Sequence, residues 1–294
     1  MSADVLFLEY TLKTNMETEF LKLQSAGSDY IIYDAFKSPL KRDADVTVLA
    51  KKICNRHFGV GGKGLVILQP GEKLSLRIRN FQPTGQEVLS NGASLICAAR
   101  YAYDTGLVNE DSFSVETMDG LLLCEVMDSS SIRAEIGYPR TTDGERIITE
   151  SLDRKFTESI LIDNREYSFT PCIIDSYRMV MFVGENEFPA QGFVRKIEQQ
   201  MRFQGQESID FVKVVARDEI IVRSWEHKTG ETSGCGAGAG AAVVASVLSG
   251  FVEREVVVHL KTGDLFVEWD QTSGKLFCTG MAEYVFSGRY YIED

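Results

Sequence analysis

The residue best suited to chemistry is Cys235, which lies in a glycine-rich run, residues 234–238. Residues 219–225 are rich in β-branched side chains and predict a strand before it, whereas residues 237–248 are small and apolar and predict a buried helix after it. Cys235 would then stand at a helix N-terminus, where free N–H groups and the helix dipole lower the pKa of a thiol and favour a bound carboxylate. The alternative is a small residue chosen for tight packing, as many free cysteines are.

Composition narrows the function classes. The chain has 294 residues, 44% of them hydrophobic, and a formal net charge of −12, so it can fill the core of one large domain or two smaller ones. The acidic balance argues against a nucleic acid or an anionic membrane as partner. Six scattered cysteines without a CxxC pair and three histidines predict no metal site. Without a signal peptide or an apolar run of about 20 residues, we expect a soluble, cytoplasmic protein with reduced thiols.

The order of the predicted elements indicates the fold class. Short strands and a few helices that do not alternate strictly predict an α+β fold with mixed or antiparallel sheets. The helix over residues 45–58 is expected to end at Gly59, because glycine suits the position after a helix. The other predicted helices cover residues 93–103, 189–201 and 237–248. The predicted strands cover residues 20–34 (two strands), 65–68, 74–81, 113–128 (two strands), 132–137, 167–170, 179–183, 219–225, 255–261, 265–269, 276–279 and 289–292.

An internal repeat predicts two similar lobes. Each half has a Thr-Gly turn (residues 84–85 and 229–230), then a glutamate (Glu87 and Glu231), a small polar or glycine-rich segment and an alanine-rich helix. The repeat predicts two lobes, each with a helix whose N-terminus points at a shared cleft. One lobe is expected over residues 1–135 plus 283–294 and the other over 136–282. Chance recurrence of common turn residues is the alternative.

Several motifs together resemble the diaminopimelate epimerase family of cofactor-independent racemases and epimerases. The segment Trp225–Ala242 is similar to the family's YERGxGETxACGTGAxA, and the resemblance extends from about Phe20 to Ile292. The other matching segments are residues 27–34 (GNDFxxxD), 56–65 (RxFGIGxDGL), 80–92 (NxDGSxxxxCGNG), 137–139 (MGxP), 279–282 (TGPA) and 285–288 (VFxG).

The resemblance implies a fold, a chemistry and a set of site residues. Two cysteines at opposed helix N-termini exchange the α-proton of an amino acid, without pyridoxal phosphate or a metal. It also implies a homodimer and a role in lysine and cell-wall precursor metabolism. Cys235 matches the second catalytic cysteine. The positions that match or replace the family's substrate contacts are Ser28, Asn80, Ser90, Asn91, Ser176, Ser208, Glu226, His227, Gly236 and Ala237.

Two departures from the family pattern bear on function. Leu89 stands at the first cysteine, and leucine cannot transfer a proton; Ser90 is adjacent, and Cys97 lies deeper in the next helix. His227 replaces an arginine that could bind a carboxylate through two hydrogen bonds, so diaminopimelate itself is expected to fit poorly. The leading hypothesis is an amino-acid epimerase that uses Cys235. The alternatives are a one-base lyase or dehydratase and an amino-acid-binding protein that has lost catalysis.

Overall fold

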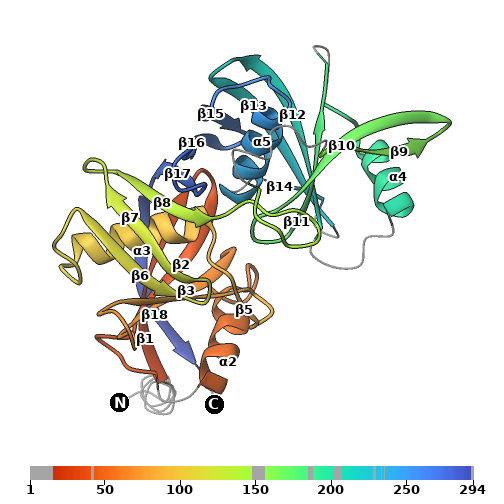
Figure 1. Cartoon of the computed structure of the whole chain (residues 1–294). Coiled ribbons are helices and arrows are strands. Elements are labelled where there is room, and N and C mark those ends of the chain that lie inside the picture. Colours follow the sequence, from red (N-terminus) through yellow and green to blue (C-terminus); the bar gives the residue numbers. More distant parts are fainter. Residues whose placement is uncertain are drawn as a thin grey trace, which may run out of the picture.

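The protein consists of two lobes that meet along one pair of strands (Figure 1). This computed structural model describes residues 16–40, 43–147, 156–184, 188–201, 207–227, 230–232, 234 and 236–292. The first lobe, here the N-lobe, contains β1 (Met16–Ser25), β2 (Ser28–Asp34), α2 (Asp43–Ile53), β3 (Gly64–Gln69), β4 (Arg77–Phe81), β5 (Glu87–Val88), α3 (Gly92–Asp104), β6 (Ser112–Thr117), β7 (Gly120–Val126), β8 (Ser131–Gly137) and the returning strand β18 (Glu283–Ile292).

The second lobe, here the C-lobe, repeats this order. It contains β9 (Glu158–Ile162), β10 (Arg165–Ile173), β11 (Tyr177–Phe182), α4 (Gln191–Met201), β12 (Ser208–Ala216), β13 (Glu219–Glu226), β14 (Gly230–Thr232), α5 (Gly236–Leu248), β15 (Glu255–Leu260), β16 (Gly263–Trp269) and β17 (Leu276–Met281).

Strand pairing confirms the predicted repeat and the α+β fold. In the N-lobe β2 is parallel to β3, β3 is antiparallel to β4, β4 is parallel to β6, and β6, β7 and β8 follow as antiparallel neighbours. In the C-lobe β11, β12, β13, β15 and β16 pair in the same senses, and β17 closes the series. The two glutamates of the sequence repeat both form ion pairs across the following hairpin, Arg79 with Glu87 and Arg223 with Glu231. The antiparallel pair β8–β17 joins the lobes.

Each lobe is built around one buried helix. Helix α5 consists of glycine, alanine, valine and leucine apart from Ser246, whose hydroxyl donates to the carbonyl of Ala242 at 2.7 Å. A helix that is small and apolar on every side can be enclosed by sheet on all faces, and α5 and α3 are both buried over most of their length. Side chains of both helices belong to one continuous hydrophobic core.

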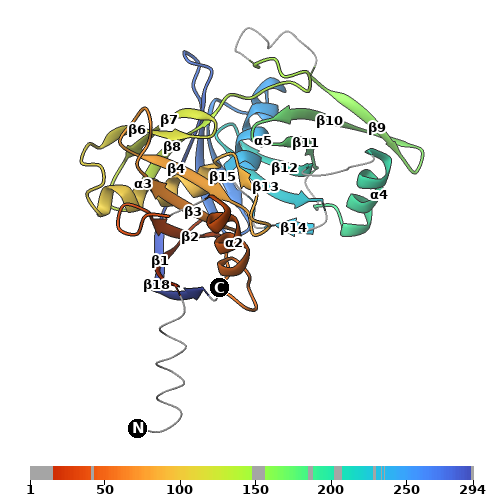
Figure 2. The ribbon, with the colours of Figure 1, turned by 90° about the horizontal axis from the view of Figure 1, so that it is seen from below.

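A second helix covers the outer face of each sheet. Helix α2 packs Val46, Leu49 and Ile53 against β2 and β3, and α4 packs Val194 and Ile197 against strands of the C-lobe. Figure 2 shows α2 and α4 on the outside of their lobes. The layers are therefore the same in both lobes: a central helix, a curved sheet and an outer helix.

The predicted elements overlap observed ones, but one helix end was misplaced and four strands were missed. The helix expected over residues 45–58 ends at Ile53, because the side chain of Asn55 accepts the N–H groups of His57 at 2.8 Å and Phe58 at 2.9 Å and turns the chain. Strands β5, β9, β12 and β14 were not predicted. The predicted lobe boundary at residues 135/136 falls inside β8 and stays a prediction. No helix in the described ranges is long and apolar enough to cross a membrane.

Candidate active site

The two central helices begin at the same place. Gly92 is the first residue of α3 and Gly236 the first residue of α5. A Cβ atom added to Gly236 would lie 3.1 Å from the Cα of Gly92 and 3.4 Å from the sulfur of Cys278, which is tight packing. Glycine at both positions thus lets the two helix N-termini touch, and their dipoles converge on one point of the interface between the lobes.

Cys235 comes directly before α5, but it lies outside the described residues. Its neighbour Gly234 is described, and its carbonyl accepts a hydrogen bond from the hydroxyl of the buried Ser28 at 3.3 Å. The ammonium of Lys63 lies 3.5 Å from the same hydroxyl. The N-lobe therefore contacts the chain next to Cys235 through Ser28, one of the predicted site residues.

Asn91 caps the other helix. Its side-chain oxygen accepts the N–H of Ser94 at 3.1 Å and the hydroxyl of Tyr30 at 3.0 Å, and the hydroxyl of Ser94 accepts the N–H of Asn91 at 3.2 Å. This reciprocal arrangement is a capping box, which satisfies backbone donors that a helix N-terminus leaves free. The sequence prediction assigned Asn91 to substrate binding, and the structure adds this structural role.

Asn80 and Ser90 lie together behind this cap. The Asn80 amide donates to the Ser90 hydroxyl at 2.7 Å, and its own Oδ1 is buried and has no partner in the described part of the chain. The N–H of Ser90 donates to Asp119 at 2.9 Å. The surrounding protein desolvates the Asp119 carboxyl and raises its pKa, the hydrogen bond from Ser90 opposes this, and the charge of Asp175 adds to it.

A cavity of about 480 Å³ between the lobes collects half of the ten predicted binding residues. It is lined by five of them: Asn91, Ser176, Ser208, Glu226 and His227. Three neighbouring strands explain how they meet, since Ser208 at the start of β12 lies opposite Arg178 near the start of β11 and opposite Glu226 at the end of β13. Gly236 and Ala237 are buried in the first turn of α5.

The sequence matches a known protein family. The family model for diaminopimelate epimerase matches residues 20–142 and 178–285. The diaminopimelate epimerase of Pelotomaculum thermopropionicum is 37% identical over 277 residues, covering 92% of this chain and 98% of that protein. The chain belongs to the diaminopimelate epimerase family. Accordingly it is an isomerase of the racemase and epimerase type. The enzyme of the same name from Geobacillus thermodenitrificans is 36% identical, covering 92% of this chain and 96% of its own.

Solved structures with little sequence similarity have the same fold. A hydroxyproline epimerase from Agrobacterium vitis superposes with a TM-score of 0.69 at 14% identity, covering 95% of this chain and 93% of that chain. A phenazine biosynthesis protein of the PhzF family from Bacillus anthracis reaches 0.64 at 16% identity, covering 94% of this chain and 99% of that chain. At such identities the likeness concerns the fold alone.

Leu89, at the position of the first cysteine in the family motif, separates two cavities. It lines the interlobe cavity and also a neighbouring cavity of about 370 Å³, whose wall includes Ser90 and Asp119. Its side chain is 37% exposed, so it faces open space with a group that carries no exchangeable proton. Leu89 is therefore part of the wall of the cleft and supplies only hydrocarbon there.

None of the five described cysteines lines the interlobe cavity or its neighbour. All five are buried and none is in a disulfide. Cys97, inside α3, has no exposed surface, and burial raises the pKa of its thiol. Burial likewise raises the pKa of Cys172 to about 12. The thiols of Cys97 and Cys172 are thus held in the neutral form within the packed core, unlike a cysteine at a helix N-terminus.

His227, at the position of the family arginine, contacts a carboxylate on α4. Its Nδ1 lies 3.2 Å from the carboxylate of Glu198 on α4, and its backbone N–H donates to the carbonyl of Glu207 at 3.1 Å. The cavity wall also contains five charged residues that were not among the predicted site residues: Lys63, Glu87, Asp175, Arg178 and Glu207. Each lies at or just before the start of a strand, which is the signal that could have identified them.

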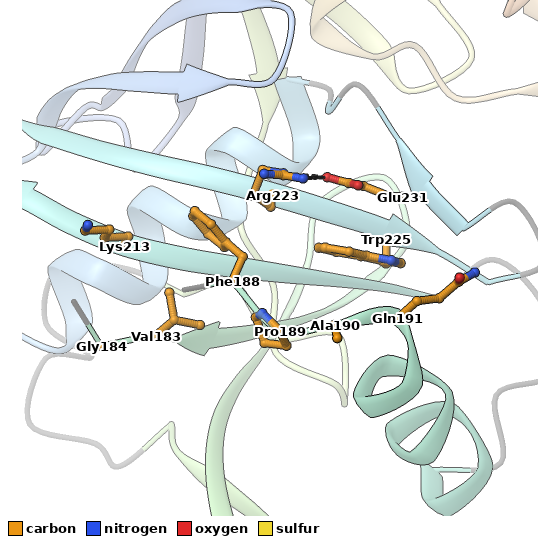
Figure 3. Close-up of a pocket in the computed structure, with 10 residues that line it drawn as sticks. All are labelled: Val183, Gly184, Phe188, Pro189, Ala190, Gln191, Lys213, Arg223, Trp225 and Glu231. Carbon is orange, nitrogen blue, oxygen red and sulfur yellow. Dashed lines mark hydrogen bonds and ion pairs between the residues drawn. The ribbon is translucent and has the colours of Figure 1, made fainter. Parts of the chain in front are cut away.

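A larger cavity lies away from these residues. It has a volume of about 630 Å³ on the outer face of the C-lobe, between β12, β13 and the start of α4. Figure 3 shows Phe188 and Trp225 in its wall, beside the ion pair of Arg223 and Glu231. None of the predicted site residues that the structure describes lines this cavity, so the interlobe cavity is the candidate active site.

Proposed function

We propose that the protein is a cofactor-independent amino-acid epimerase or racemase in which Cys235 transfers the α-proton. The observation that carries the proposal is the contact between Gly92 and Gly236, which joins two helix N-termini beside a cavity lined by Asn91, Ser208 and Glu226. Converging helix dipoles stabilise negative charge, and the reaction develops negative charge on the carbon that loses its proton and on the adjacent carboxylate.

The proposed mechanism begins with the thiolate of Cys235. The thiolate removes the α-hydrogen, and the electron pair of the broken C–H bond passes to the planar carbanion. The N–H groups of Gly236 and Ala237 bind the substrate carboxylate, Glu226 binds the α-ammonium group, and Asn80 and Asn91 orient the head group. Ser28, Ser90, Ser176, Ser208 and His227 form the rest of the binding wall. A proton returned to the opposite face gives the inverted product.

Leu89 favours a second candidate function. A proton must reach the face opposite to Cys235, and the side chain at the family position for that donor is a hydrocarbon. A one-base lyase or dehydratase needs only the thiolate, because a leaving group departs after the α-proton is removed. A binding protein without catalysis needs neither. The epimerase is the leading proposal because the chain retains the family's second cysteine as Cys235, together with the Gly-Glu-Thr of residues 230–232 before it and Gly236 and Gly238 after it.

Proton exchange in D₂O tests these functions. The protein is incubated with each stereoisomer of diaminopimelate and of a panel of single amino acids, and loss of the α-proton and inversion are followed by NMR and chiral chromatography. We expect exchange with inversion, lowered by about 10²–10⁴-fold in Cys235→Ala, which is the usual contribution of a general base. Cys54→Ala, which removes a buried thiol at the end of α2, is the control and should keep full activity.

Each other result selects an alternative. Exchange without inversion would replace the epimerase by a one-sided base, and absence of exchange with every compound would leave a binding protein. The variant Leu89→Cys distinguishes the epimerase from the one-base enzyme further. A thiol restored at this position should raise the rate of inversion. It should not change the rate of α-proton exchange for the stereoisomer that Cys235 already deprotonates.

The oligomeric state, the cellular location and the metabolic role are also proposals that rest on the family resemblance. We infer a homodimer in the cytoplasm from the family resemblance, and size-exclusion chromatography with light scattering tests the oligomeric state. Participation in lysine and cell-wall precursor metabolism depends on diaminopimelate being the substrate.

A further inference from the structure

We propose that a buried polar cluster, formed by Arg178, Asp210 and Ser224, is a positioning element of the active site that fixes the first turn of α5. The inference rests on the proposed function and names residues that the proposed mechanism does not otherwise use. It follows from the packing of Gly238, the third residue of α5.

The polar cluster comes from three neighbouring strands of the C-lobe. Arg178 belongs to β11, Asp210 to β12 and Ser224 to β13, and Asp210 and Ser224 are direct partners across their strand pair. The guanidinium of Arg178 lies 3.1 Å from the carboxylate of Asp210, which also accepts the hydroxyl of Ser224 at 2.5 Å. All three residues are buried. Contacts from two sides therefore hold the carboxylate in one orientation.

The cluster lies directly against the first turn of α5. A Cβ atom added to Gly238 would lie 2.8 Å from Oδ1 of Asp210, 3.0 Å from Nη1 of Arg178 and 3.2 Å from Oγ of Ser224. At such distances there is no room for a side chain, and only glycine lets the backbone come this close. The helix thus contacts polar atoms from all three strands at one residue.

The same turn is also packed on its other side. A Cβ atom added to Gly236 would lie 3.1 Å from the Cα of Gly92 in the N-lobe. The N–H groups of Gly236 and Ala237, which bind the substrate carboxylate in the proposed mechanism, therefore lie between the N-lobe helix and the polar cluster. Cys235 directly precedes this turn, so a shift of the turn would move the thiol and the backbone donors together.

Stability alone does not account for the cluster. A buried ion pair is often no more stabilising than apolar residues of the same volume, because the desolvation of both charges offsets their attraction. The N-lobe has Tyr30 and Val66 at the strand positions equivalent to Arg178 and Asp210. Apolar contacts have no direction, whereas hydrogen-bonded charges define one arrangement. The directional contacts thus belong to the lobe whose central helix follows Cys235.

The double variant Arg178→Met/Asp210→Val separates position from stability. It should stay folded, because no buried charge is left without its partner. We expect the kcat for α-proton exchange to fall by about 10²-fold in the folded protein, a loss that a displacement of about 1 Å can cause. Circular dichroism and urea unfolding monitor the fold, and the D₂O assay measures kcat. The control Arg217→Met/Glu253→Gln removes an exposed ion pair of the C-lobe and should keep the wild-type kcat.

Two glycines of α5 give a second, matched comparison. A Cβ atom added to Gly240 would meet only the ends of hydrocarbon side chains, the nearest being Ile136 at 3.0 Å and Ile174 at 3.1 Å, and these can move aside. Gly238→Ala and Gly240→Ala raise helix propensity equally, but only the first places a methyl group against the polar cluster. We expect Gly238→Ala to lower kcat by about 10²-fold and Gly240→Ala to leave it within about threefold.

Alkylation of Cys235 reports on its surroundings without a substrate. The five described cysteines are buried, so iodoacetamide should react mainly with Cys235, and Cys235→Ala gives the background rate. A thiol moved out of line with the helix N-terminus loses part of the stabilisation of its thiolate. The pH midpoint of alkylation should therefore rise by about one unit in the double variant and in Gly238→Ala.

The outcomes separate this inference from the proposed function. A wild-type kcat with an unchanged alkylation midpoint in the folded double variant would overturn the inference, and so would equal effects of Gly238→Ala and Gly240→Ala. Either result would leave the proposed function standing. If no compound exchanged its α-proton, the proposed function would fail, and the alkylation midpoint alone would decide whether the cluster positions Cys235.

Discussion

The two lobes have the same strand order but treat the N-terminus of their central helix differently. In the N-lobe the side chains of Asn91 and Ser94 cap α3, and Leu89 contributes hydrocarbon to the cleft. In the C-lobe the residue before α5 is Cys235, within a glycine-rich run. The N-lobe helix end is therefore capped by side chains, whereas the C-lobe helix end carries the thiol to which the proposed mechanism assigns the proton transfer.

The strands that pack against the two central helices also differ between the lobes, in the polarity of their side chains. The shared pairing pattern makes Tyr30 of β2 equivalent to Arg178 of β11, and Val66 of β3 equivalent to Asp210 of β12. Tyr30 supports the N-lobe helix through a neutral hydrogen bond to Asn91, whereas a Cβ atom on Gly238 of α5 would lie 3.0 Å from Arg178. The C-lobe thus uses buried charge where the N-lobe uses a hydroxyl and hydrocarbon.

The largest effect is expected from breaking this buried charge pair. Asp210→Asn should lower the free energy of unfolding by about 3–5 kcal/mol, because it leaves the guanidinium of Arg178 without its buried partner. The double variant Arg178→Met/Asp210→Val, which imitates the apolar N-lobe, should recover most of this loss. Urea unfolding followed by circular dichroism measures both. A single variant that unfolds like the wild type would show that the two lobes do not differ in this respect.

The next largest expected effect is a difference between the lobes in how pH changes the stability of the folded state. Asp29 and Tyr177 are equivalent positions in β2 and β11. Burial raises the pKa of Tyr177 to about 12, and the charges of Glu158 and Glu207 add to this. An unfolded tyrosine ionises near pH 10, so the folded state should lose stability as pH rises from about 10 towards 12. Tyr177→Phe should flatten this part of the curve of urea midpoint against pH.

Asp29 provides the comparison on the acid side. Burial acts to raise its pKa, but hydrogen bonds from Arg56 and Lys22 outweigh burial and hold the pKa of the carboxyl below its ordinary value. Its contribution to stability is therefore complete above the ordinary range near pH 4 and is lost as pH falls further. The variant Asp29→Asn should flatten only the acid limb of the curve of urea midpoint against pH. An effect of either variant on both limbs would contradict the assignment.

The smallest effect concerns the two ion pairs that the sequence repeat preserves. Double-mutant cycles on Arg79–Glu87 and Arg223–Glu231 should each give a coupling of about 0.2–1 kcal/mol, typical of partly exposed pairs. The N-lobe pair should be the stronger, because Arg79 is 12% exposed and Arg223 is 31% exposed. Equal couplings, measured by urea unfolding, would remove this difference between the lobes.

Local patterns predicted much of the fold. The small apolar residues of α5 predicted a buried helix, and the recurring Thr-Gly turn and glutamate predicted two lobes, because each of these signals lies within a few consecutive residues. The end of α2 was missed, since the side-chain turn at Asn55 overrides the expected stop at Gly59. Strand β12 was missed although Ile209, Phe211 and Val212 supply a suitable apolar pattern.

The site was less predictable, because it depends on contacts across the chain. The family motif brought attention to Asn91, Ser208 and Glu226, and the structure places all three in one cavity. The pairing of His227 with Glu198 on α4 has no local signal, since those residues come from separate elements. Long-range contacts of this kind decide which charged side chains line the cleft.

The returning strand β18 has a consequence for how the chain is made. It pairs with β1 along nearly its whole length, from Met16 opposite Ile292 to Gln24 opposite Glu283. The whole C-lobe is therefore inserted between β8 and the last strand of the N-lobe. During synthesis the C-lobe emerges as one continuous segment. The N-lobe sheet is complete only after residues 283–292, which form β18, have been synthesised. We expect the second lobe to reach its final sheet first, although it is translated later.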